Sequence, residues 1–584
     1  MERNIFNPPP AILINQQSFK PMTSQTCLAK LISLLLVAAF NAAAIPVVSP
    51  QQPSQRDRRV VVPLAQSPTP APSPTPSSHQ TSVDNDVDEP RPTQPVRVGK
   101  TPKTIAELQM RIAEVLDKPE LAPAMVGIKV TSLETGRVLF EENGSKLLRP
   151  ASNMKLYTVA AALDRLSPDY RFVTSVYAAA RPDAAGILHS DLTIYGRGDP
   201  SIAARFNGGD YFRGINDLAA QIAASGLKRV EGDLVGDETY FSGPRYGSGW
   251  SWEDLQWWYG AEVSALTVND NALDLLVKPG SAVGVAAVIT TGPPDPLLVI
   301  VNRVMTGTKG SKRELTLHRG LGADALEIHG SIPLDDRGYA AGVGISHPAL
   351  LFVYLLRSSL AQRGVIFTGK SRTVPAPAYA SGPATSRPAG SIEIASMQSP
   401  PLSVIAAQTL KPSQNLYTEL ILRTLGRVVP TSPVSSDTTR TSEDAGLEVV
   451  KTFLKEAGVN ISGLVLTDGS GLSRNDMITA AASVQLLTYM SRHRYAGVFR
   501  EALPIAGVDG TLRSRMKGTP AENNVRAKTG ALSSAASLAG YLTTAGGENL
   551  VFSIMVNNYP VDADVRSLCI DPITVVLASF SGRS

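Results

Sequence analysis

A serine and a lysine, three residues apart at the start of a predicted helix, constrain this chain more than any other feature. The sequence reads Pro-Ala-Ser152-Asn-Met-Lys155, and apolar residues then recur at helical spacing up to Leu166. Side chains three apart lie on one helix face, so Ser152 and Lys155 can meet at the positive end of the helix dipole. A serine hydroxyl becomes a nucleophile when a base takes its proton, and a desolvated lysine amine can be that base. The alternative is that Ser152 only caps the helix.

Two later motifs carry matching chemistry. Ser413-Gln-Asn415 precedes a predicted helix, and Lys528-Thr529-Gly530 precedes strand-like residues. Each motif is short enough to occur by chance. The ordered set S-x-x-K, S-x-N and K-T-G, however, is typical of penicillin-binding proteins and class A β-lactamases. A side chain at Gly530 would crowd a substrate that approaches the strand, which gives that glycine a reason of its own.

The composition describes a globular chain with a small net charge. Its 584 residues are 43% hydrophobic and 18% charged, which fits a folded protein with about two to four domains. The net charge is +4 and no run of basic residues occurs, so the sequence gives no reason to expect nucleic acid as a partner. The six histidines show no metal-ligand spacing. We therefore expect neither a metal nor a cofactor.

The N-terminus has the pattern of a secretory signal peptide. An apolar core over residues 31–40 follows Lys30, and three alanines at 42–44 fit a small-residue cleavage site. The apolar run is short for a membrane span. We predict a signal peptide over residues 1–44; the alternative is an uncleaved anchor that keeps the protein attached to the membrane.

The segment after the signal is predicted to be a linker. Residues 45–103 hold few large apolar side chains and include an alternating proline stretch at 67–76, typical of a semi-rigid spacer. The alternative that this segment is a disordered tail without a function is equally open. Met22 instead of Met1 as the start would give a signal of ordinary length. After cleavage Cys569 is the only cysteine left, so we expect no internal disulfide.

The first and last parts of the folded chain are predicted to build one sheet covered by helices. Thr104 and Glu107 make a capping box for an amphipathic helix that ends before Pro119. Alternating apolar residues then predict a hairpin, and near the other end two antiparallel strands and a terminal helix suit an α/β sandwich. The predicted strands are residues 126–130, 138–140, 537–542 and 550–556, and the terminal helix is residues 571–580.

Residues 156–412, between the first two motifs, form a long insertion whose residue pattern differs from that of the rest of the chain. From Ala282 to Gly344 short apolar runs alternate with Gly and Pro, which suggests a small β-rich domain. The other elements predicted in this segment are strands over 191–195 and 227–234, helices over 218–224, 348–362 and 402–410, and a loop over 374–390. After this segment we predict a helix over 444–457 and loops over 429–441 and 468–474.

All four tryptophans lie within Gly249–Trp258. A cluster of this kind can be a platform on which a sugar stacks. It can equally be a packed core or a hinge between domains. The sequence leaves both interpretations open.

With these motifs in place, the chain resembles the class C low-molecular-mass penicillin-binding proteins, the D-alanyl-D-alanine carboxypeptidase/endopeptidase group similar to penicillin-binding protein 4. The resemblance covers residues 104–584. Beyond the three motifs it includes residues 232–237, 264–269, 468–474 and 506–512.

The resemblance implies an α/β (α+β) fold. Its main part is a transpeptidase/β-lactamase-like sandwich of a mainly antiparallel sheet with helices, and two smaller inserted domains are rich in β-structure. The predicted transpeptidase-like domain consists of residues 104–175 and 345–584, with inserted domains at 176–280 and 281–344.

The resemblance also implies the substrate and the catalytic roles. The substrate would be a peptidoglycan stem peptide ending in D-Ala-D-Ala, or a D-Ala cross-link. Ser152 would attack the carbonyl of the penultimate D-Ala with Lys155 as base, and water would hydrolyse the acyl-enzyme. Ser413 would relay a proton to the leaving amine. The backbone N–H groups of Ser152 and Ala531 would form the oxyanion hole.

The remaining motif residues would bind the substrate. Asn415 would contact its amide, and Lys528 and Thr529, with Gly530 beside them, would hold its terminal carboxylate. β-Lactam antibiotics would be inhibitors, and the protein would be exported to the periplasm or cell wall of a bacterium. Two rivals stay open: a serine β-lactamase, and a wall-binding scaffold without activity. The sequence does not decide between removal of D-Ala and cleavage of cross-links.

Overall fold

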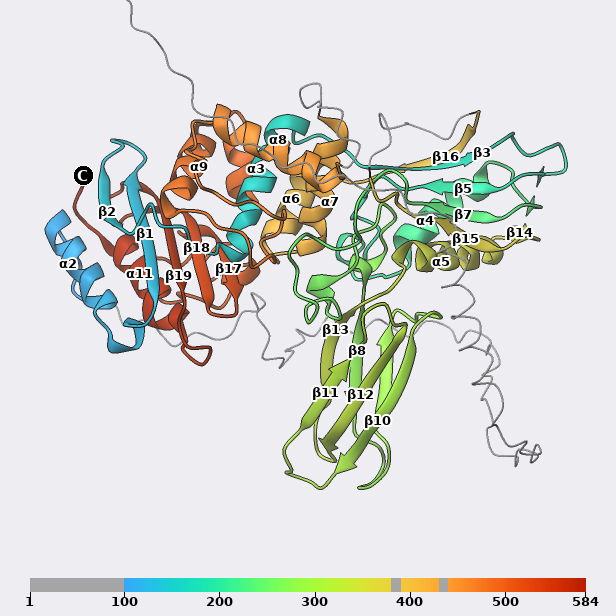
Figure 1. Cartoon of the computed structure of the whole chain (residues 1–584), viewed down its shortest axis with the longest axis horizontal. Coiled ribbons are helices and arrows are strands. Elements are labelled where there is room, and N and C mark those ends of the chain that lie inside the picture. Colours follow the sequence, from blue (N-terminus) through green and yellow to red (C-terminus); the bar gives the residue numbers. More distant parts are fainter. Residues whose placement is uncertain (1–98, 380–389, 430–439) are drawn as a thin grey trace, which may run out of the picture. The chain divides into compact units, whose positions relative to one another are not determined.

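The computed structural model describes residues 99–379, 390–429 and 440–584. The predicted signal peptide, most of the proline-rich linker, and parts of the two predicted loops at 374–390 and 429–441 lie outside these residues. The two ends of the described chain share one antiparallel sheet (Figure 1). In spatial order its strands are β17 (Arg526–Leu532), β18 (Ala535–Thr543), β19 (Asn549–Asn557), β1 (Met125–Ser132) and β2 (Val138–Glu142).

Helices cover both faces of this sheet (Figure 1). Along β19 the side chains at 550, 552, 554 and 556 pack on one face, whereas Val551 and Met555 pack on the other. Because both faces are buried, the strand is a continuous apolar run and not an alternating one. The first face is covered by α2 (Ile105–Leu116) and α11 (Asp571–Ser579). On the second face, α9 (Ala480–Arg492) packs directly against the strands. The same apolar core also contains α3 (Met154–Leu166), α6 (Leu402–Leu410), α7 (Asn415–Val428), α8 (Ser442–Glu456) and α10 (Ala496–Glu501), which pack on one another.

The chain between α3 and α6 forms further sheets. A mixed five-stranded sheet runs in the order β15 (Ser371–Val374), β7 (Leu234–Asp237), β5 (Leu192–Tyr195), β3 (Val173–Ala178) and β16 (Ile392–Gln398). A short parallel sheet consists of β14 (Ile366–Phe367), β6 (Arg229–Val230) and β4 (Ile187–Leu188), and helices α4 (Arg213–Ala224) and α5 (Pro348–Gln362) pack together beside them.

The segment 281–344, predicted to be β-rich, supplies five of the six strands of two three-stranded sheets, and β8 (Ala272–Lys278) precedes it. The sheets are β13 (Tyr339–Gly344), β8 and β9 (Val288–Gly292), and β10 (Val299–Gly307), β12 (Ala325–Pro333) and β11 (Glu314–His318). The division into domains remains a prediction. Since β15 and β16 pair with β7 and β3, we propose that the last boundary lies near residue 399, not at 345.

Some predicted elements differ from the structure. The single strand predicted for 227–234 is two short strands in two sheets, β6 and β7. They are separated at Gly232, where an added Cβ would lie 2.5 Å from the backbone nitrogen of Asp191. The capping box is half complete: Thr104 accepts from the Glu107 backbone N–H, but the Glu107 carboxylate accepts from Lys103. Helix α9 and strand β16 were not predicted.

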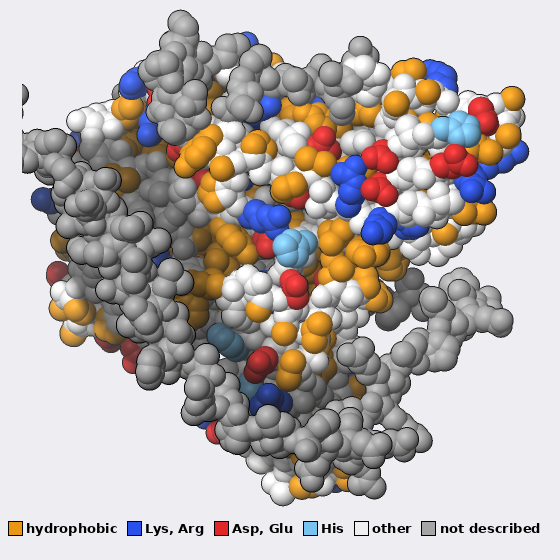
Figure 2. Space-filling model, turned by 45° about the vertical axis from the view of Figure 1, so that its right-hand side comes forward, with side chains coloured by type: hydrophobic (Ala, Val, Ile, Leu, Met, Phe, Trp, Pro, Cys, Tyr) orange, Lys and Arg blue, Asp and Glu red, His pale blue; other side chains and the backbone are white. Residues whose placement is uncertain are grey.

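Charged side chains of both signs are interspersed with apolar ones over the face in Figure 2. Several of the exposed charges in the chain are paired; Arg372, for example, donates to Asp191 and Asp233 at 2.7 and 2.8 Å. Exposed pairs contribute about 0–1 kcal/mol each. This mixture agrees with the small net charge. Among the described residues, no helix is long and apolar enough to cross a bilayer.

Candidate active site

Ser152 lies in a single 3-10 turn, Ala151–Asn153, directly before α3. Its neighbours Ala151 and Asn153 are buried, while Ser152 is half-buried. The residue at the N-cap of α3 is Asn153, which makes no capping bond with its side chain. The Ser152 hydroxyl is instead 2.9 Å from Lys155 Nζ. The structure therefore does not support the alternative in which Ser152 only caps the helix.

Lys155 is fully buried and is held by oxygen atoms from two other segments. Its Nζ donates to Asn415 Oδ1 at 2.5 Å and to the Ser470 carbonyl at 2.7 Å. The amide of Asn415 is itself fixed, because its Nδ2 donates to the Tyr259 carbonyl at 2.9 Å. A buried lysine requires such partners, since an unpaired charge away from water is costly. The S-x-x-K and S-x-N motifs thus meet at this amine.

The K-T-G strand brings a second buried lysine beside the S-x-N segment. Lys528 Nζ donates to Ser413 Oγ and to the Thr529 carbonyl, both at 2.9 Å. Ser413 has a φ of 65°, a left-handed conformation that is uncommon for a residue with a side chain. Such backbone strain is often found at functional sites. The Thr529 hydroxyl lies 2.8 Å from the hydroxyl of Thr511.

The edge strand β17 packs directly against the turn that carries Ser152. The Asn153 amide donates to the Lys528 carbonyl at 2.9 Å. A Cβ on Gly530 would lie 2.2 Å from Ser537 Oγ and 2.6 Å from the Pro150 carbonyl. Gly530 is therefore required by the close approach of strand and turn, a reason independent of substrate. Ala531, predicted for the oxyanion hole, follows it on the same strand.

The loop at 468–474 contributes contacts that the motifs alone did not indicate. The Asp468 carboxylate accepts from the Ser470 hydroxyl at 2.8 Å and from the backbone N–H groups of Gly471 and Ser473 at 2.7 and 3.1 Å. This organises the loop so that the Ser470 carbonyl reaches Lys155. The segment was singled out only by the family resemblance, because a backbone carbonyl leaves no side-chain signal in a sequence.

The tryptophan segment packs near the same site. Trp250, Trp257 and Trp258 lie against a small cluster that contains Ala151 and Leu472, whereas Trp252 is 59% exposed. Trp250 Nε1 donates to Asp468 at 2.8 Å. The packed interpretation thus describes three of the four tryptophans.

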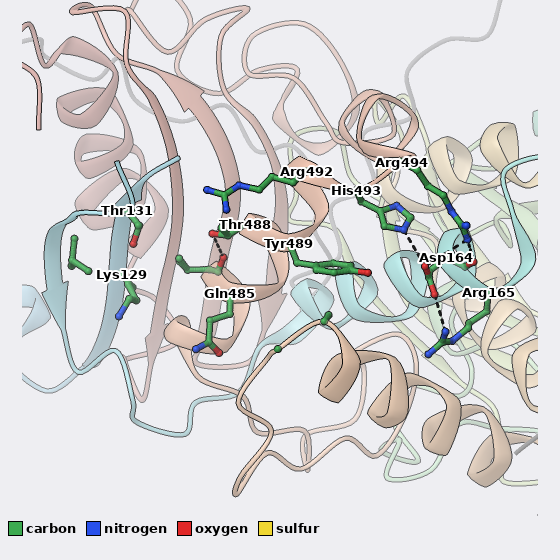
Figure 3. A pocket seen from close by; sticks show the side chains of 15 residues that line it. Lys129, Thr131, Asp164, Arg165, Gln485, Thr488, Tyr489, Arg492, His493 and Arg494 are labelled. Carbon is green, nitrogen blue, oxygen red and sulfur yellow. Dashed lines mark hydrogen bonds and ion pairs between the residues drawn. The ribbon is translucent and has the colours of Figure 1, made fainter. Parts of the chain in front are cut away.

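A groove of about 1030 Å³ lies elsewhere, between β1, α9 and the ends of α3 and α8. Figure 3 shows Lys129 and Thr131 on one wall and His493 beside Asp164, whose carboxylate is 3.0 Å from the histidine Nε2. None of the predicted site residues lines this groove. The cluster around Ser152 is therefore the candidate site.

A serine and a buried lysine at the start of a helix, with S-x-N and K-T-G segments alongside in an α/β sandwich, define the class of serine hydrolases that includes penicillin-binding proteins and β-lactamases. The model of the D-Ala-D-Ala carboxypeptidase 3 (S13) family matches residues 108–580, and the chain belongs to this family. This match confirms the family and the serine-type carboxypeptidase activity that were predicted from the sequence.

Relatives and solved structures agree with this assignment. A D-alanyl-D-alanine carboxypeptidase from an Actinomadura strain is 34% identical over 82% of this chain and 86% of its own length. A D-alanyl-D-alanine carboxypeptidase from Haemophilus influenzae is 25% identical over 74% of this chain and 85% of its own length. The crystal structure of penicillin binding protein 4 from H. influenzae matches 81% of this chain and 99% of that chain, with 22% identity and a TM-score of 0.68. The predicted fold class is therefore confirmed.

Proposed function

We propose that this chain hydrolyses the D-Ala-D-Ala ends of peptidoglycan stem peptides, or D-Ala cross-links, through an acyl-enzyme on Ser152. The observation that carries the proposal is the hydrogen-bonded set of Ser152, Lys155 and Asn415, with Lys528 and Ser413 beside it. The names of the Actinomadura and Haemophilus relatives support the substrate class.

The contacts of Lys155 suit a base for Ser152. Asn415 Oδ1 and the Ser470 carbonyl can only accept hydrogen bonds, so they take the two N–H groups of a neutral amine. The Ser152 hydroxyl lies 2.9 Å from Nζ and accepts from the amine in this structure. We propose that the lone pair of the neutral amine faces this hydroxyl when the substrate is attacked. Ser152 Oγ attacks the carbonyl carbon of the penultimate D-Ala while its proton moves to Lys155 Nζ. The backbone N–H groups of Ser152 and Ala531 would stabilise the oxyanion.

The second lysine suits the leaving group. Ser413 Oγ accepts from Lys528 Nζ and is in a position to pass a proton to the amine of the departing D-Ala. Lys528 and Thr529 would bind the terminal carboxylate by charge-assisted hydrogen bonds, and Asn415 would contact the substrate amide. Water then hydrolyses the Ser152 ester and regenerates the hydroxyl.

β-Lactams fit the same site, because they present a reactive carbonyl and a carboxylate at a similar separation. The H. influenzae protein with this fold has been crystallised in complex with a β-lactam. We therefore propose that penicillin acylates Ser152.

Intact mass spectrometry after penicillin treatment tests this proposal. The expected result is one penicillin adduct per chain, mapped by peptide digestion to Ser152, and no adduct on Ser152→Ala with an unchanged fold. An adduct that persists on another residue in Ser152→Ala would overturn the assignment. Steady turnover of a chromogenic cephalosporin would instead favour the β-lactamase alternative.

We also propose that the protein is exported and that the mature chain begins near Ile45. Lys30, the apolar run at 31–40 and the alanines at 42–44 support this. N-terminal sequencing of the extracytoplasmic protein is the test, and a start upstream of Leu31 would mean an uncleaved anchor.

A further inference from the structure

The backbone of Gly469 is held by two helices, at its N–H and at its carbonyl. The Gly469 carbonyl accepts from Thr158 Oγ1 of α3 at 2.8 Å, and its N–H donates to Glu419 Oε1 of α7 at 3.0 Å. A Cβ on Gly469 would lie 3.1 Å from Leu422 Cβ, so the loop passes tightly between these helices. The next carbonyl along the chain, that of Ser470, is the one that accepts from Lys155.

Helix α7 therefore reaches Lys155 by two routes. Asn415 contacts Nζ directly, at 2.5 Å. Glu419 lies four residues later, on the same face of the helix one turn on, and reaches Nζ through the backbone of Gly469 and Ser470. Helix α3 contributes similarly, because Thr158 lies three residues after Lys155 and donates to the carbonyl of the same residue, Gly469.

We infer that Glu419 is a positioning residue for Lys155: it holds the backbone of Gly469, and the carbonyl of the next residue, Ser470, aims the lysine amine at Ser152. The inference rests on the proposed function, in which Lys155 is the base. If the Ser470 carbonyl moves, the Lys155 amine loses this acceptor and its orientation is less restricted. The lone pair then no longer points at the Ser152 hydroxyl for most of the time, and acylation slows.

The surroundings of Glu419 favour a neutral carboxylic acid. The side chain is fully buried, and Oε2 has no hydrogen-bond partner among the described residues. An ionised carboxyl with one oxygen unsatisfied is costly in such a site. The charged and titratable groups that face it are Asp468, Glu443 of α8, Arg423 of α7 and, across the Ser470 carbonyl, Lys155. Burial, followed by repulsion from Asp468, raises the pKa of Glu419 well above its ordinary value.

The test compares Glu419→Gln with Glu419→Ala in the full chain, using the rate of acylation by penicillin as a function of pH. Glutamine keeps a neutral acceptor for the Gly469 N–H. We expect Glu419→Gln to stay within about threefold of wild type with the same pH profile. Glu419→Ala should be slower by about ten- to a hundredfold, mainly in the acylation step and not in penicillin binding.

Two further variants separate positioning from stability. Thr424 is buried on α7, and its hydroxyl has no partner among the described residues, so Thr424→Val perturbs the same helix without touching the loop. We expect its acylation rate to equal that of wild type. Thr158→Val releases the Gly469 carbonyl from α3 and should slow acylation by a similar factor. Combined with Glu419→Ala it should cost less than the product of the two effects, because both act on the backbone of one residue, Gly469.

The outcomes distinguish this inference from the proposed function. If wild type gives no adduct on Ser152, the proposed function fails and the inference fails with it. If wild type is acylated but both Glu419→Ala and Thr158→Val react at its rate, only the positioning role is overturned. If Glu419→Gln is as slow as Glu419→Ala, or shifts the pH profile, the neutral acceptor is rejected. Should Glu419→Ala not fold, Thr158→Val and Glu419→Gln still decide the matter.

Discussion

The hydroxyl of Thr529 is expected to recognise the free carboxylate of the substrate. It lies beside Lys528 Nζ, at 3.3 Å, and its present partner is the hydroxyl of Thr511. A charge-assisted hydrogen bond contributes about 1.5–3 kcal/mol. Thr529→Val should therefore lower kcat/KM for a free D-Ala-D-Ala peptide by about ten- to a hundredfold. The same peptide with an amidated terminus should be affected far less, because that contact is already lost.

The control for this prediction is Thr529→Ser, which keeps the hydroxyl and should retain most of the activity toward the free peptide. If Thr529 only packs the strand, Thr529→Val will lower kcat/KM equally for both substrates. Equal losses would reject the carboxylate role.

Asp199, in the loop after β5, is expected to make stability depend on pH. One carboxyl oxygen accepts from the backbone and hydroxyl of Ser201 at 2.8 and 2.7 Å, and the other has no partner among the described residues. Burial raises the pKa of Asp199 from 3.8 to about 6. The folded state thus holds this proton more tightly than the unfolded chain. Its contribution to stability is complete below pH about 4 and falls as the pH rises to about 6, by about 3 kcal/mol.

Asp199→Asn should remove this pH-dependent part. Urea unfolding of the variant and of wild type at pH 4 and pH 7 measures it. The variant should gain stability relative to wild type between the two pH values. A constant difference would mean that the pKa of Asp199 is not raised in the folded protein.

At the scale of elements, the contact between β17 and the Ser152 turn should not tolerate any side chain at Gly530. An added Cβ would meet Ser537 Oγ and the Pro150 carbonyl at 2.2 and 2.6 Å. Gly530→Ala should push the strand from the turn, lower the free energy of unfolding by about 1–3 kcal/mol, and slow penicillin acylation. Gly497→Ala is the matched control, because nothing lies within 4 Å of its added Cβ. An acylation rate unchanged in Gly530→Ala would contradict the required fit.

For some elements with strong local signals, the first and last residues predicted from the sequence are those found in the structure. Helices α5 and α6 have the predicted bounds, Pro348–Gln362 and Leu402–Leu410, because apolar residues at helical spacing lie between clear breaking residues. The single strand predicted for residues 227–234 was wrong because β6 and β7 pair with strands of two different sheets, and such pairing is set by tertiary structure and not by the local sequence.

The candidate site likewise contains some groups that the sequence predicted and others that only the structure identified. Ser152, Lys155 and Asn415 were visible because their side chains form motifs, and the structure brings them within hydrogen-bond distance. The carbonyls of Ser470 and Tyr259, which complete the set, are backbone groups. Every residue has such a carbonyl, so only the fold can reveal which ones take part.

At the scale of the whole molecule, the long insertion supplies part of the site. The Tyr259 carbonyl fixes the Asn415 amide, and Trp250 donates to the carboxylate that organises the 468–474 loop. The chain between the first two motifs is therefore joined to Lys155 through two hydrogen-bonded routes. A compact domain without these residues would lack both.

Trp250→Phe tests the second route while preserving most of the ring packing. The substitution removes the 2.8 Å hydrogen bond from Nε1 to Asp468, a bond to a charged group. Such bonds contribute about 1.5–3 kcal/mol. Part of that loss should loosen the loop and the Ser470 carbonyl, so we expect penicillin acylation to slow by roughly tenfold or less. Trp252→Phe is the control in the same segment, because Trp252 is 59% exposed. If both variants acylate at the wild-type rate, the insertion packs against the loop without positioning it.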